Sequence, residues 1–594
     1  MRCVQGNSRN GPRAATKAER GSVSRSGSAA EVGLENCGAC HQFGAAAGRR
    51  PALRFVCGSA ALHCKSREWS DAAKNLRNCR RAVGPRPQCS HPQQDVELNG
   101  IFPWLRGRCD RGPVALRLVC GFAAPCFPRP ASALLRLLRF PKLFGCLCGL
   151  SLTASATFAA SDATWSFSTA QAKITPKDLI WQGGFASRTK PAEGTLDDLF
   201  IKVLALEAPD GGQAVLVTAD LVGIPKWLYD DLCRELERRH GLKRSQIRFA
   251  SSHTHSGPVL RDALRDIYPF GDSQRGLIST YSDWLEQTIL ETVGKALAAK
   301  QPATLWAGEG KATFAMNRRT NDEGKLAELL RRGESPKGPS DFAVPVLAVR
   351  SSEGQLRAVV FGYAAHTSAL TQNYRWSADY AGVTQRALEA KHPAAAAMFF
   401  QGCGSDQSAV PRGTVELCQK LGENLATAVE AVLEKPMRPV TPKLRTAFEF
   451  LPLDFVEQPA PAELETIAKG TDYRARWAKR LLAESAAGKA FERGYAEYPV
   501  QVWKLGADQL WIALGGEVCV DYALRFKKEF GAGVWVNGYA NDVMAYIPSR
   551  RLWEEGGYQA GAFEVYGLPA TKWCPDIEAR IADATARLVG KVRE

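Results

Sequence analysis

The chain has 594 residues, of which 45% are hydrophobic, and a formal net charge of +16. This composition provides for a large buried core, and the charge suggests a comparison with nucleic-acid-binding proteins. However, residues 1–150 hold 24 Lys and Arg against 8 Asp and Glu, whereas the other residues hold 53 basic and 53 acidic residues. The main body therefore has no excess of positive charge to bind phosphates, which excludes nucleic acid as its partner.

Residues 1–135 differ from the rest of the chain in composition. They lack sustained helical or strand periodicity, and 12 of the 17 cysteines lie within residues 1–150. The pair Cys37 and Cys40 has the spacing of a zinc-binding motif, but no second pair follows at finger spacing. We interpret residues 1–135 as a basic, Cys- and Arg-rich segment that is either a disordered arm or a mis-assigned start.

Residues 136–160 have the pattern of a secretory signal peptide. Three basic residues precede an apolar run over residues 143–153, and Ala154-Ser155-Ala156 provides a small-residue cleavage site. The apolar run is too short to span a bilayer as a helix. The pattern predicts a secreted or periplasmic protein, and a buried core helix is the alternative.

Strand and helix patterns alternate through the rest of the chain, which predicts one large catalytic domain over residues 165–594. The predicted strands are Ala214–Ile224, Gln246–Ser251, Val344–Arg350, Gln355–Ala365, Ala394–Phe400, Val500–Leu505 and Leu510–Leu514. The predicted helices are 228–241, Tyr281–Gln301, Thr414–Lys435, Pro461–Gly470, Tyr473–Lys489, Val518–Phe530 and a last one from Asp576. We therefore expect an α/β fold in which mixed sheets are flanked by helices.

Several polar residues stand where predicted strands run out into glycine-rich corners. His253 and His255 follow the strand at Gln246–Ser251, His366 and Glu517 follow two others, and a fourth corner spans residues 537–548. Only five histidines occur after residue 150. Because neutral imidazole is the commonest transition-metal ligand in proteins, two histidines within three residues predict a metal site.

The sequence resembles the neutral (non-lysosomal) ceramidases over about residues 174–558. The motifs that carry the resemblance are Ala250-Ser251-Ser252-His253-Thr254-His255-Ser256-Gly257-Pro258, Asn317-Arg318-Arg319, Ala365-His366-Thr367-Ser368, Gly516-Glu517 and Tyr546-Ile547-Pro548. The first motif is specific, whereas the others gain weight from their order. The resemblance implies a Zn²⁺ ion held by His253, His366, Glu517 and Tyr546.

The resemblance also implies catalytic roles for His255, Arg318 and Tyr558. His255 lies one pleat beyond His253, so we expect it to miss the ion and instead to bind substrate, share a proton and stabilise the oxyanion. Arg318 would bind a substrate hydroxyl or the developing carboxylate, and Tyr558 stands at the offset of a tyrosine that touches substrate. Ser408 falls near a loosely matching family segment and is a substrate-binding candidate.

The function that this resemblance implies is a secreted zinc-dependent amidohydrolase. It would cleave the N-acyl amide of ceramide or a related lipid to fatty acid and amine by attack of a zinc-bound water. Two alternatives remain open: a metal-dependent hydrolase of another envelope amide or ester, and a catalytically silent surface binding protein. The partner is a lipid or N-acyl amine, and the sequence leaves peripheral membrane contact and oligomeric state open.

Each site residue also has an ordinary structural interpretation. His366 would suit a buried core, Glu517 could cap the helix predicted after it, Tyr546 could be a half-buried aromatic, and Arg318 could be surface charge. The chain has 36 residues after Tyr558, which leaves room for the last predicted helix. We therefore expect no C-terminal β-sandwich of the kind that the ceramidases carry.

Overall fold

The computed structural model describes residues 56–57, 60–61, 164–456 and 458–594. The chain divides into two compact units, and the unit of residues 7–152 contributes the short ladder of β1 (Val56–Cys57) and β2 (Ala60–Ala61). Otherwise the predicted basic segment at 1–135 and the predicted signal peptide at 136–160 lie outside the described residues. All other helices and strands that the structure describes lie within residues 164–594.

The larger sheet has nine strands, and most of its neighbours are antiparallel. Its strands are β3 (Trp165–Lys173), β5 (Phe200–Glu207), β6 (Gln213–Ala219), β7 (Ile247–Ser251), β8 (Gln301–Lys311), β10 (Ala343–Ser351), β11 (Leu356–Tyr363), β13 (Ala396–Gln401) and β15 (Arg438–Val440). Their order is β13-β11-β10-β8-β3-β5-β6-β7, with β15 paired to β8. The pairs β6–β7 and β11–β13 are parallel, so the sheet is mixed.

The second sheet contains four strands, in the order β16-β17-β18-β20. These strands are β16 (Leu444–Asp454), β17 (Gly494–Leu505), β18 (Gln509–Leu514) and β20 (Trp535–Asn537). Three two-stranded ladders complete the strands of this unit: β4 (Gly194–Thr195) with β12 (Arg375–Trp376), β9 (Ala315–Asn317) with β14 (Gln407–Ala409), and β19 (Glu517–Val518) with β21 (Tyr546–Ile547). The last two ladders include predicted site residues.

Eleven helices accompany these sheets in the described part of the unit, and some of them have recognisable caps. The helices are α2 (Lys226–His240), α3 (Asp272–Ala298), α4 (Leu326–Arg331), α5 (Asp379–Lys391), α6 (Val415–Leu433), α7 (Pro461–Ala468), α8 (Tyr473–Ala486), α9 (Val520–Phe530), α10 (Arg550–Glu555), α11 (Phe563–Tyr566) and α12 (Ile577–Arg593). Helix α2 ends at Gly241, which adopts the left-handed conformation that glycine tolerates best. The Thr414 hydroxyl accepts a hydrogen bond from the Leu417 amide and caps α6.

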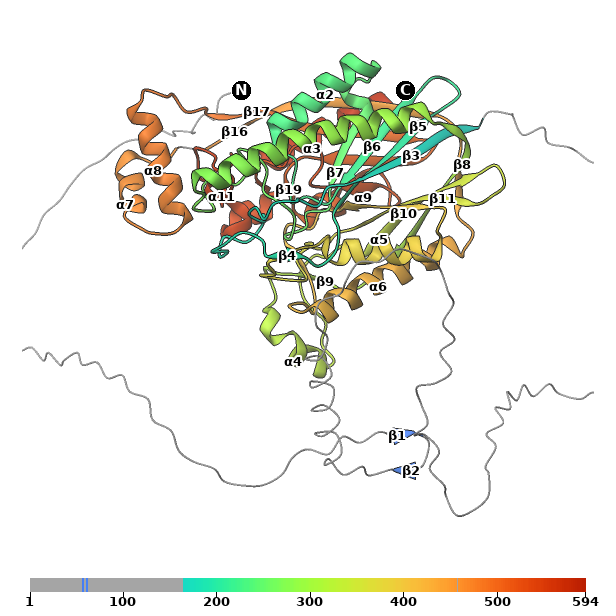
Figure 1. Cartoon of the computed structure of the whole chain (residues 1–594), viewed down its shortest axis with the longest axis horizontal. Helices are drawn as coiled ribbons and strands as arrows, with labels where there is room; N and C mark the ends of the chain where they lie inside the picture. The colour runs from blue at the N-terminus through green and yellow to red at the C-terminus, as the bar shows by residue number, and fades with distance from the viewer. Residues whose placement is uncertain (1–55, 58–59, 62–163, 457) are drawn as a thin grey trace, which may run out of the picture. The chain divides into compact units, whose positions relative to one another are not determined.

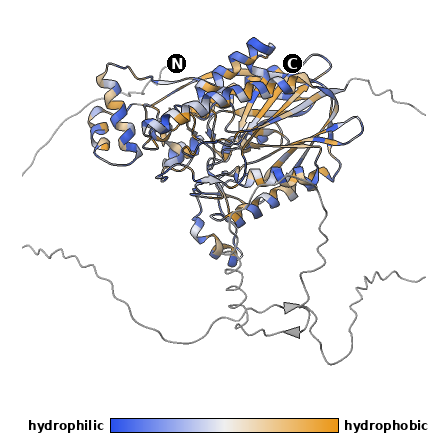
Figure 2. Ribbon diagram, viewed as in Figure 1, coloured by the Kyte–Doolittle hydropathy of each residue, from blue (hydrophilic) through white to orange (hydrophobic). Residues whose placement is uncertain are grey.

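Side-chain packing arranges these elements in four layers. One face of the nine-stranded sheet packs against α2 and α3 at β5 and β6, and against α5 and α6 at β10, β11 and β13 (Figure 1). Its other face packs against the four-stranded sheet through Trp503, Trp511 and Trp535. The far face of that second sheet is covered by α9 and α12. Figure 2 shows the consequence: the strands are mainly hydrophobic, and the covering helices carry both hydrophobic and hydrophilic residues.

A buried arginine joins the two sheets. Arg248 of β7 is fully buried, and its guanidinium lies 4.1 Å from the ring centre of Trp503 and 4.8 Å from that of Trp511. It donates hydrogen bonds to the side-chain oxygen of Gln501 and to the carbonyl of Trp511. Each cation–π contact is worth about 0.5–2 kcal/mol. Since β7 leads to His253 and β18 leads to Glu517, this arginine fixes the relative positions of two strands that end at the predicted site.

The structure confirms the predicted mixed α/β architecture and alters several boundaries. The helix predicted at Tyr281–Gln301 is α3, which begins earlier, at Asp272. The sequence pattern missed its first turns because they are largely polar and exposed and therefore show no apolar period. The strand predicted to reach Ile224 ends at Ala219. Leu221 and Ile224 belong to the loop that follows, and their buried side chains extended the apolar pattern beyond the strand. Among the described residues, none of the helices combines the length and the apolar character needed to cross a membrane.

Candidate metal centre

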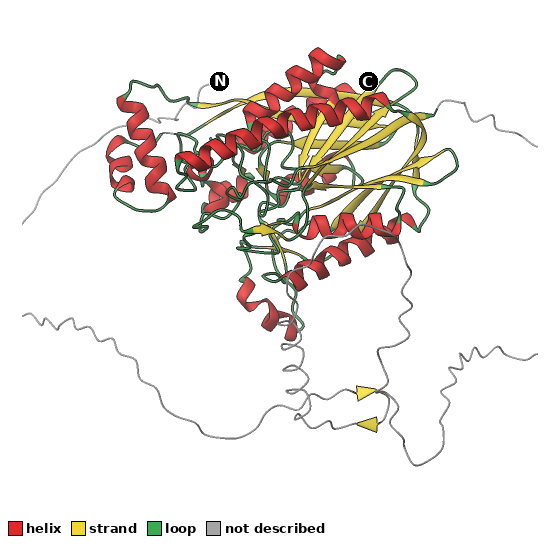
Figure 3. Cartoon of the chain, viewed as in Figure 1, coloured by secondary structure: helices red, strands yellow, loops and turns green. Residues whose placement is uncertain are grey.

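The predicted site residues follow the ends of β7, β11, β18 and β20 in the chain. Backbone hydrogen bonds join the loops that carry these residues, and Figure 3 shows many loops of the domain close together beside the strands. The bonds run from Ser251 N to Tyr539 O, from His255 N to Thr367 O, from His366 N to Gln407 O and from Tyr539 N to Gly516 O. The four glycine-rich corners of the sequence therefore form one structure.

His253 is held by its backbone and by the far side of its ring. Its φ of 58° lies in the left-handed region, which is uncommon outside glycine and is often found at functional sites. The ring Nδ1 lies 2.6 Å from the carbonyl oxygen of Val222. Because a carbonyl only accepts hydrogen bonds, Nδ1 must carry the proton, and Nε2 is left with a free lone pair.

His366 is oriented in the same way from the opposite corner. Its Nδ1 lies 3.2 Å from the carbonyl oxygen of Gly404, and its backbone forms a bridge with Ser408. Burial lowers the pKa of His366 well below its ordinary value, and the nearby Arg318 charge lowers it further. The ring is therefore neutral at neutral pH, with its Nε2 lone pair directed inward.

Glu517 and Tyr546 reach the same place from neighbouring strands. They are direct partners in the parallel ladder of β19 and β21. The turn before Glu517 requires Gly516, because φ is 75° there and a Cβ would lie 2.6 Å from the Ile547 side chain. This ladder also decides against Glu517 as a helix cap, since α9 begins three residues later with Cys519 as its N-cap.

The Glu517 carboxylate is divided between two environments. Its Oε1 accepts a hydrogen bond from the Tyr566 hydroxyl, whereas Oε2 has no hydrogen-bond partner within the described part of the chain. Burial raises the pKa of Glu517, but His253, the Tyr566 hydroxyl and the Arg318 charge lower it by more, so the pKa lies below its ordinary value. Glu517 is therefore a buried carboxylate with one oxygen free.

The distances between the free atoms fit a divalent cation. Nε2 of His253 lies 3.1 Å from Nε2 of His366 and 3.4 Å from Oε2 of Glu517, and the last two atoms are 3.7 Å apart. Two ligands at about 2.0–2.1 Å from zinc in a tetrahedral arrangement are about 3.3 Å apart. Two inward lone pairs and an unpaired carboxylate oxygen repel one another without a cation. The donor set of nitrogen and oxygen suits zinc.

His255 lies closer to this centre than the pleat geometry predicts. Its Nε2 is 3.2 Å from Nε2 of His253, and the nitrogens of His253, His255 and His366 all lie within 4.8 Å of one another. The reason is the left-handed turn at His253, which ends the strand pattern after Ser251. Distance therefore does not separate the roles of the two histidines.

The surroundings of the His255 ring do differ from those of His253. Its Nδ1 is buried and finds no hydrogen-bond partner among the described residues of this unit. Phe185 packs edge-on against the ring with centroids 4.6 Å apart, and Gly184 leaves room for it, since a Cβ there would lie 2.3 Å from Cγ of His255. Metal-ligating histidines almost always donate their other N–H to an oxygen. His253 and His366 meet this condition, and His255 does not.

The remaining predicted residues lie around the centre. Half-buried Arg318 donates from Nη2 to the Ser405 carbonyl, and its Nε is buried without a partner among the described residues. Burial lowers the pKa of Arg318, but Tyr546 and Glu517 raise it above its ordinary value overall. Tyr558 is 45% exposed, with its ring 5.2 Å from that of Tyr546. Arg318 thus faces the centre, and Tyr558 lies at its rim.

Ser408 is fully buried in β14, and its hydroxyl forms no hydrogen bond to the described residues. It pairs with Met316 of β9 and bridges to His366. Its backbone thus supports the loop that holds His366. Direct contact between Ser408 and substrate stays a prediction, since the contacts of this buried residue are with its own chain.

Two tyrosines that sequence reasoning missed belong to the centre. Tyr566 donates its hydrogen bond to Glu517, and the ring of Tyr539 lies 4.3 Å from that of His253. The Tyr539 hydroxyl is 3.5 Å from Nδ1 of His366. Tyr539 stands in a corner that the sequence marked, but Tyr566 follows the last recognised motif by many residues and has no local signal.

The hydrogen bond from Tyr566 leads to a specific expectation. In Tyr566→Phe, Oε1 of Glu517 loses its donor, so the carboxylate is less firmly directed at the cation. Loss of such a second partner typically costs about 10–100-fold in metal affinity. Competition with a chromogenic chelator measures this affinity. The matched variant Tyr229→Phe, at a buried tyrosine of α2 away from the centre, should keep wild-type zinc affinity, and an equal loss in both variants would contradict the role assigned to Tyr566.

The fold and the site together define a four-layer α/β protein with a candidate divalent-metal centre at the ends of its strands. No protein-family model matches the sequence, and no curated protein matches it either. Solved structures do match. Neutral ceramidase from Pseudomonas aeruginosa has a TM-score of 0.55 at 18% identity, over 73% of this chain and 75% of that chain. A structure of ceramidase complexed with C2 has a TM-score of 0.54 at 18% identity, over 73% and 76%.

The chain therefore has the neutral ceramidase fold, as its motifs predict. At 18% identity the likeness establishes the fold, whereas the activity must be proposed from the site.

Proposed function

We propose that the chain is a zinc-dependent amidohydrolase that cleaves the N-acyl amide of ceramide or a related lipid to a fatty acid and an amine. The observation that supports this most is the set of free atoms on His253, His366 and Glu517, which face one another at 3.1–3.7 Å. Tyr546, the ladder partner of Glu517, would be the fourth ligand. Zinc, when bound, supplies a Lewis acid that polarises a carbonyl and lowers the pKa of water.

The chain's own residues supply the other requirements of amide hydrolysis. Hydrolysis adds water to the acyl carbon, breaks the C–N bond and leaves an amine that needs a proton. Burial and the neighbouring His253 lower the pKa of His255 well below the ordinary value, so the ring is neutral at neutral pH. A neutral imidazole can accept a proton from the attacking water and pass it to the leaving amine. The Arg318 guanidinium binds a substrate hydroxyl or the carboxylate that forms, and the exposed ring of Tyr558 contacts the lipid at the rim.

A matched metal and activity measurement tests this proposal. The full chain, purified without chelators, should carry one zinc per chain and release fatty acid from ceramide faster than from a simple N-acyl amine with the same acyl chain. Zinc without ceramide turnover would retain the metal centre and reject the substrate, which leaves hydrolysis of another envelope amide or ester. Zinc with no hydrolysis of any amide or ester would favour a silent binding protein, and absence of zinc would reject the proposal.

We also propose that the protein is exported, on the basis of the signal-like pattern at residues 136–160. A secreted or periplasmic location would give the enzyme access to lipids and to peripheral contact with a membrane. Fractionation of cells that express the full chain, followed by N-terminal sequencing of the exported form, tests this. Cleavage after Ala156 is expected, and retention of uncleaved chain inside the cell would reject export.

A further inference from the structure

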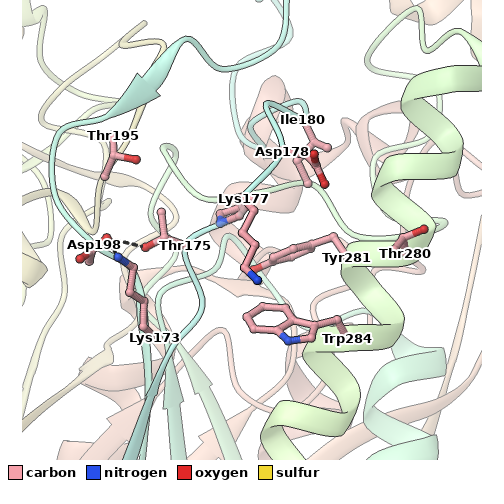
Figure 4. Close-up of a pocket in the computed structure, with 11 residues that line it drawn as sticks. Lys173, Thr175, Lys177, Asp178, Ile180, Thr195, Asp198, Thr280, Tyr281 and Trp284 are labelled. Atoms are coloured by element: carbon pink, nitrogen blue, oxygen red, sulfur yellow. Dashed lines mark hydrogen bonds and ion pairs between the residues drawn. The ribbon is translucent and has the colours of Figure 1, made fainter. Parts of the chain in front are cut away.

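A second cavity of the domain lies between the segment that follows β3 and helix α3. Its volume is about 690 Å³, within the range of roughly 300–1,000 Å³ that is typical of small-molecule sites. Figure 4 shows the side chains around it, and none of them belongs to the metal centre. Any ligand of this cavity is therefore bound independently of zinc.

One side of the cavity is apolar and aromatic. Tyr281 and Trp284 of α3 present their rings with centroids 5.6 Å apart, and Pro176 and Ile180 are buried beside them. Trp284 is 43% exposed, although it is a large aromatic side chain. An apolar wall with an exposed indole at a cavity indicates a ligand with an apolar body.

The charges around the cavity are not equally available. The Lys173 ammonium is paired with the Asp198 carboxylate at 2.8 Å. The Lys177 ammonium, by contrast, forms no hydrogen bond or ion pair with any residue that the structure describes, and in Figure 4 its side chain reaches toward the rings of Tyr281 and Trp284. Asp178 also lines the cavity, and in the same view its carboxylate lies beside Ile180 rather than beside the Lys177 ammonium. The charge next to the rings of Tyr281 and Trp284 is therefore positive.

We propose that this cavity binds a single-chain amphiphile with an anionic headgroup. The headgroup lies at the Lys177 ammonium, and the chain lies along Tyr281 and Trp284, where it covers the exposed ring of Trp284. Fatty acids and alkyl phosphates share this chemistry. The proposal goes beyond the proposed function, since it requires neither the metal nor hydrolysis.

Binding of laurate to the full chain tests the proposal, with calorimetry for affinity and 12-bromododecanoate as a quencher of nearby indole fluorescence. We expect Lys177→Gln to weaken laurate binding at least tenfold, and Lys420→Gln, at an exposed lysine of α6, to leave it unchanged. Trp284→Phe should remove the quenched part of the fluorescence while keeping the fold. Dodecyl phosphate should compete with laurate if any anionic headgroup is accepted, and failure to compete would narrow the ligand to carboxylates.

Three results would overturn the proposal: laurate affinity unchanged in Lys177→Gln, quenching unchanged in Trp284→Phe, or equal binding of dodecyltrimethylammonium. Removal of zinc by a chelator separates this cavity from the metal centre. Laurate binding that survives zinc removal but not Lys177→Gln supports the cavity, whatever the result for ceramide hydrolysis. Laurate binding that is lost with zinc belongs to the metal centre and rejects the proposal.

Discussion

Replacing His253 with Ala is expected to remove the bound zinc and to reduce amide hydrolysis roughly 1,000-fold or more, because a catalytic metal contributes several kcal/mol to transition-state stabilisation. His253 is the member of the cluster with the most contacts to the others. Its Nε2 lies within 3.1–3.4 Å of His366, His255 and Glu517. Its removal therefore takes away a ligand and also widens the space between those that remain.

The measurement is metal content per chain after desalting, together with the rate of fatty-acid release. His240→Ala is the matched control, since this exposed histidine ends α2, and it should keep both zinc and rate. Because His253 is 1% exposed, circular dichroism and thermal unfolding of metal-free wild type and variant must be compared as well. A folded His253→Ala protein that retains one zinc would show that the cation lies elsewhere.

Much of the fold could be predicted from the sequence because its strands are apolar runs and its helices are amphipathic. The run at Gln246–Ser251 became β7, and the hairpin of β10 and β11 lies where a Ser-Glu-Gly turn separates two apolar strands. The order of nine strands could not be predicted, since pairing between distant segments leaves no local pattern. The packing of one sheet on the other includes Arg248, which in the sequence looks like an ordinary charged residue.

The centre shows a similar division between what local pattern reveals and what only the folded chain brings together. The corners of His253, His366 and Glu517 could be predicted because each follows an apolar strand, and the structure brings one atom of each side chain within 3.1–3.7 Å of the other two. The carbonyl oxygens of Val222 and Gly404 that fix the two imidazoles belong to the backbone, which any residue supplies. Sequence could not identify them.

The sequence predicts that His255 lies one pleat away from His253, whereas the two Nε2 atoms are 3.2 Å apart. A strand alternates its side chains, so a residue two positions on would point the same way but lie about 7 Å further along. The chain leaves the strand at Ser251, and the left-handed backbone of His253 turns it back. The ring of His255 therefore joins the cluster, and the separate roles of the two histidines remain a prediction that must rest on other differences between them.

His255→Ala is expected to keep bound zinc and to lose about 10²–10⁴-fold in kcat, the range typical of a general acid or base. The two rings are fixed by different contacts. Val222 orients His253 through Nδ1, whereas His255 is placed by the edge of Phe185 and the space above Gly184, with its own Nδ1 unpaired among the described residues. Because no hydrogen bond to a described residue fixes the Nδ1 proton, the ring can gain or lose a proton without breaking such a bond.

Metal content and kcat for His255→Ala, set beside those for His253→Ala, decide between the two roles. Retained zinc with low kcat and little change in KM assigns His255 to proton transfer, since an interaction made only in the transition state lowers kcat and kcat/KM together. His255→Gln supplies a second test, because a glutamine can hydrogen-bond substrate but cannot carry the proton, and it should stay as slow as the alanine variant. Equal zinc loss in the two alanine variants would make His255 a ligand. Three imidazoles whose nitrogens lie within 4.8 Å of one another would then share one cation.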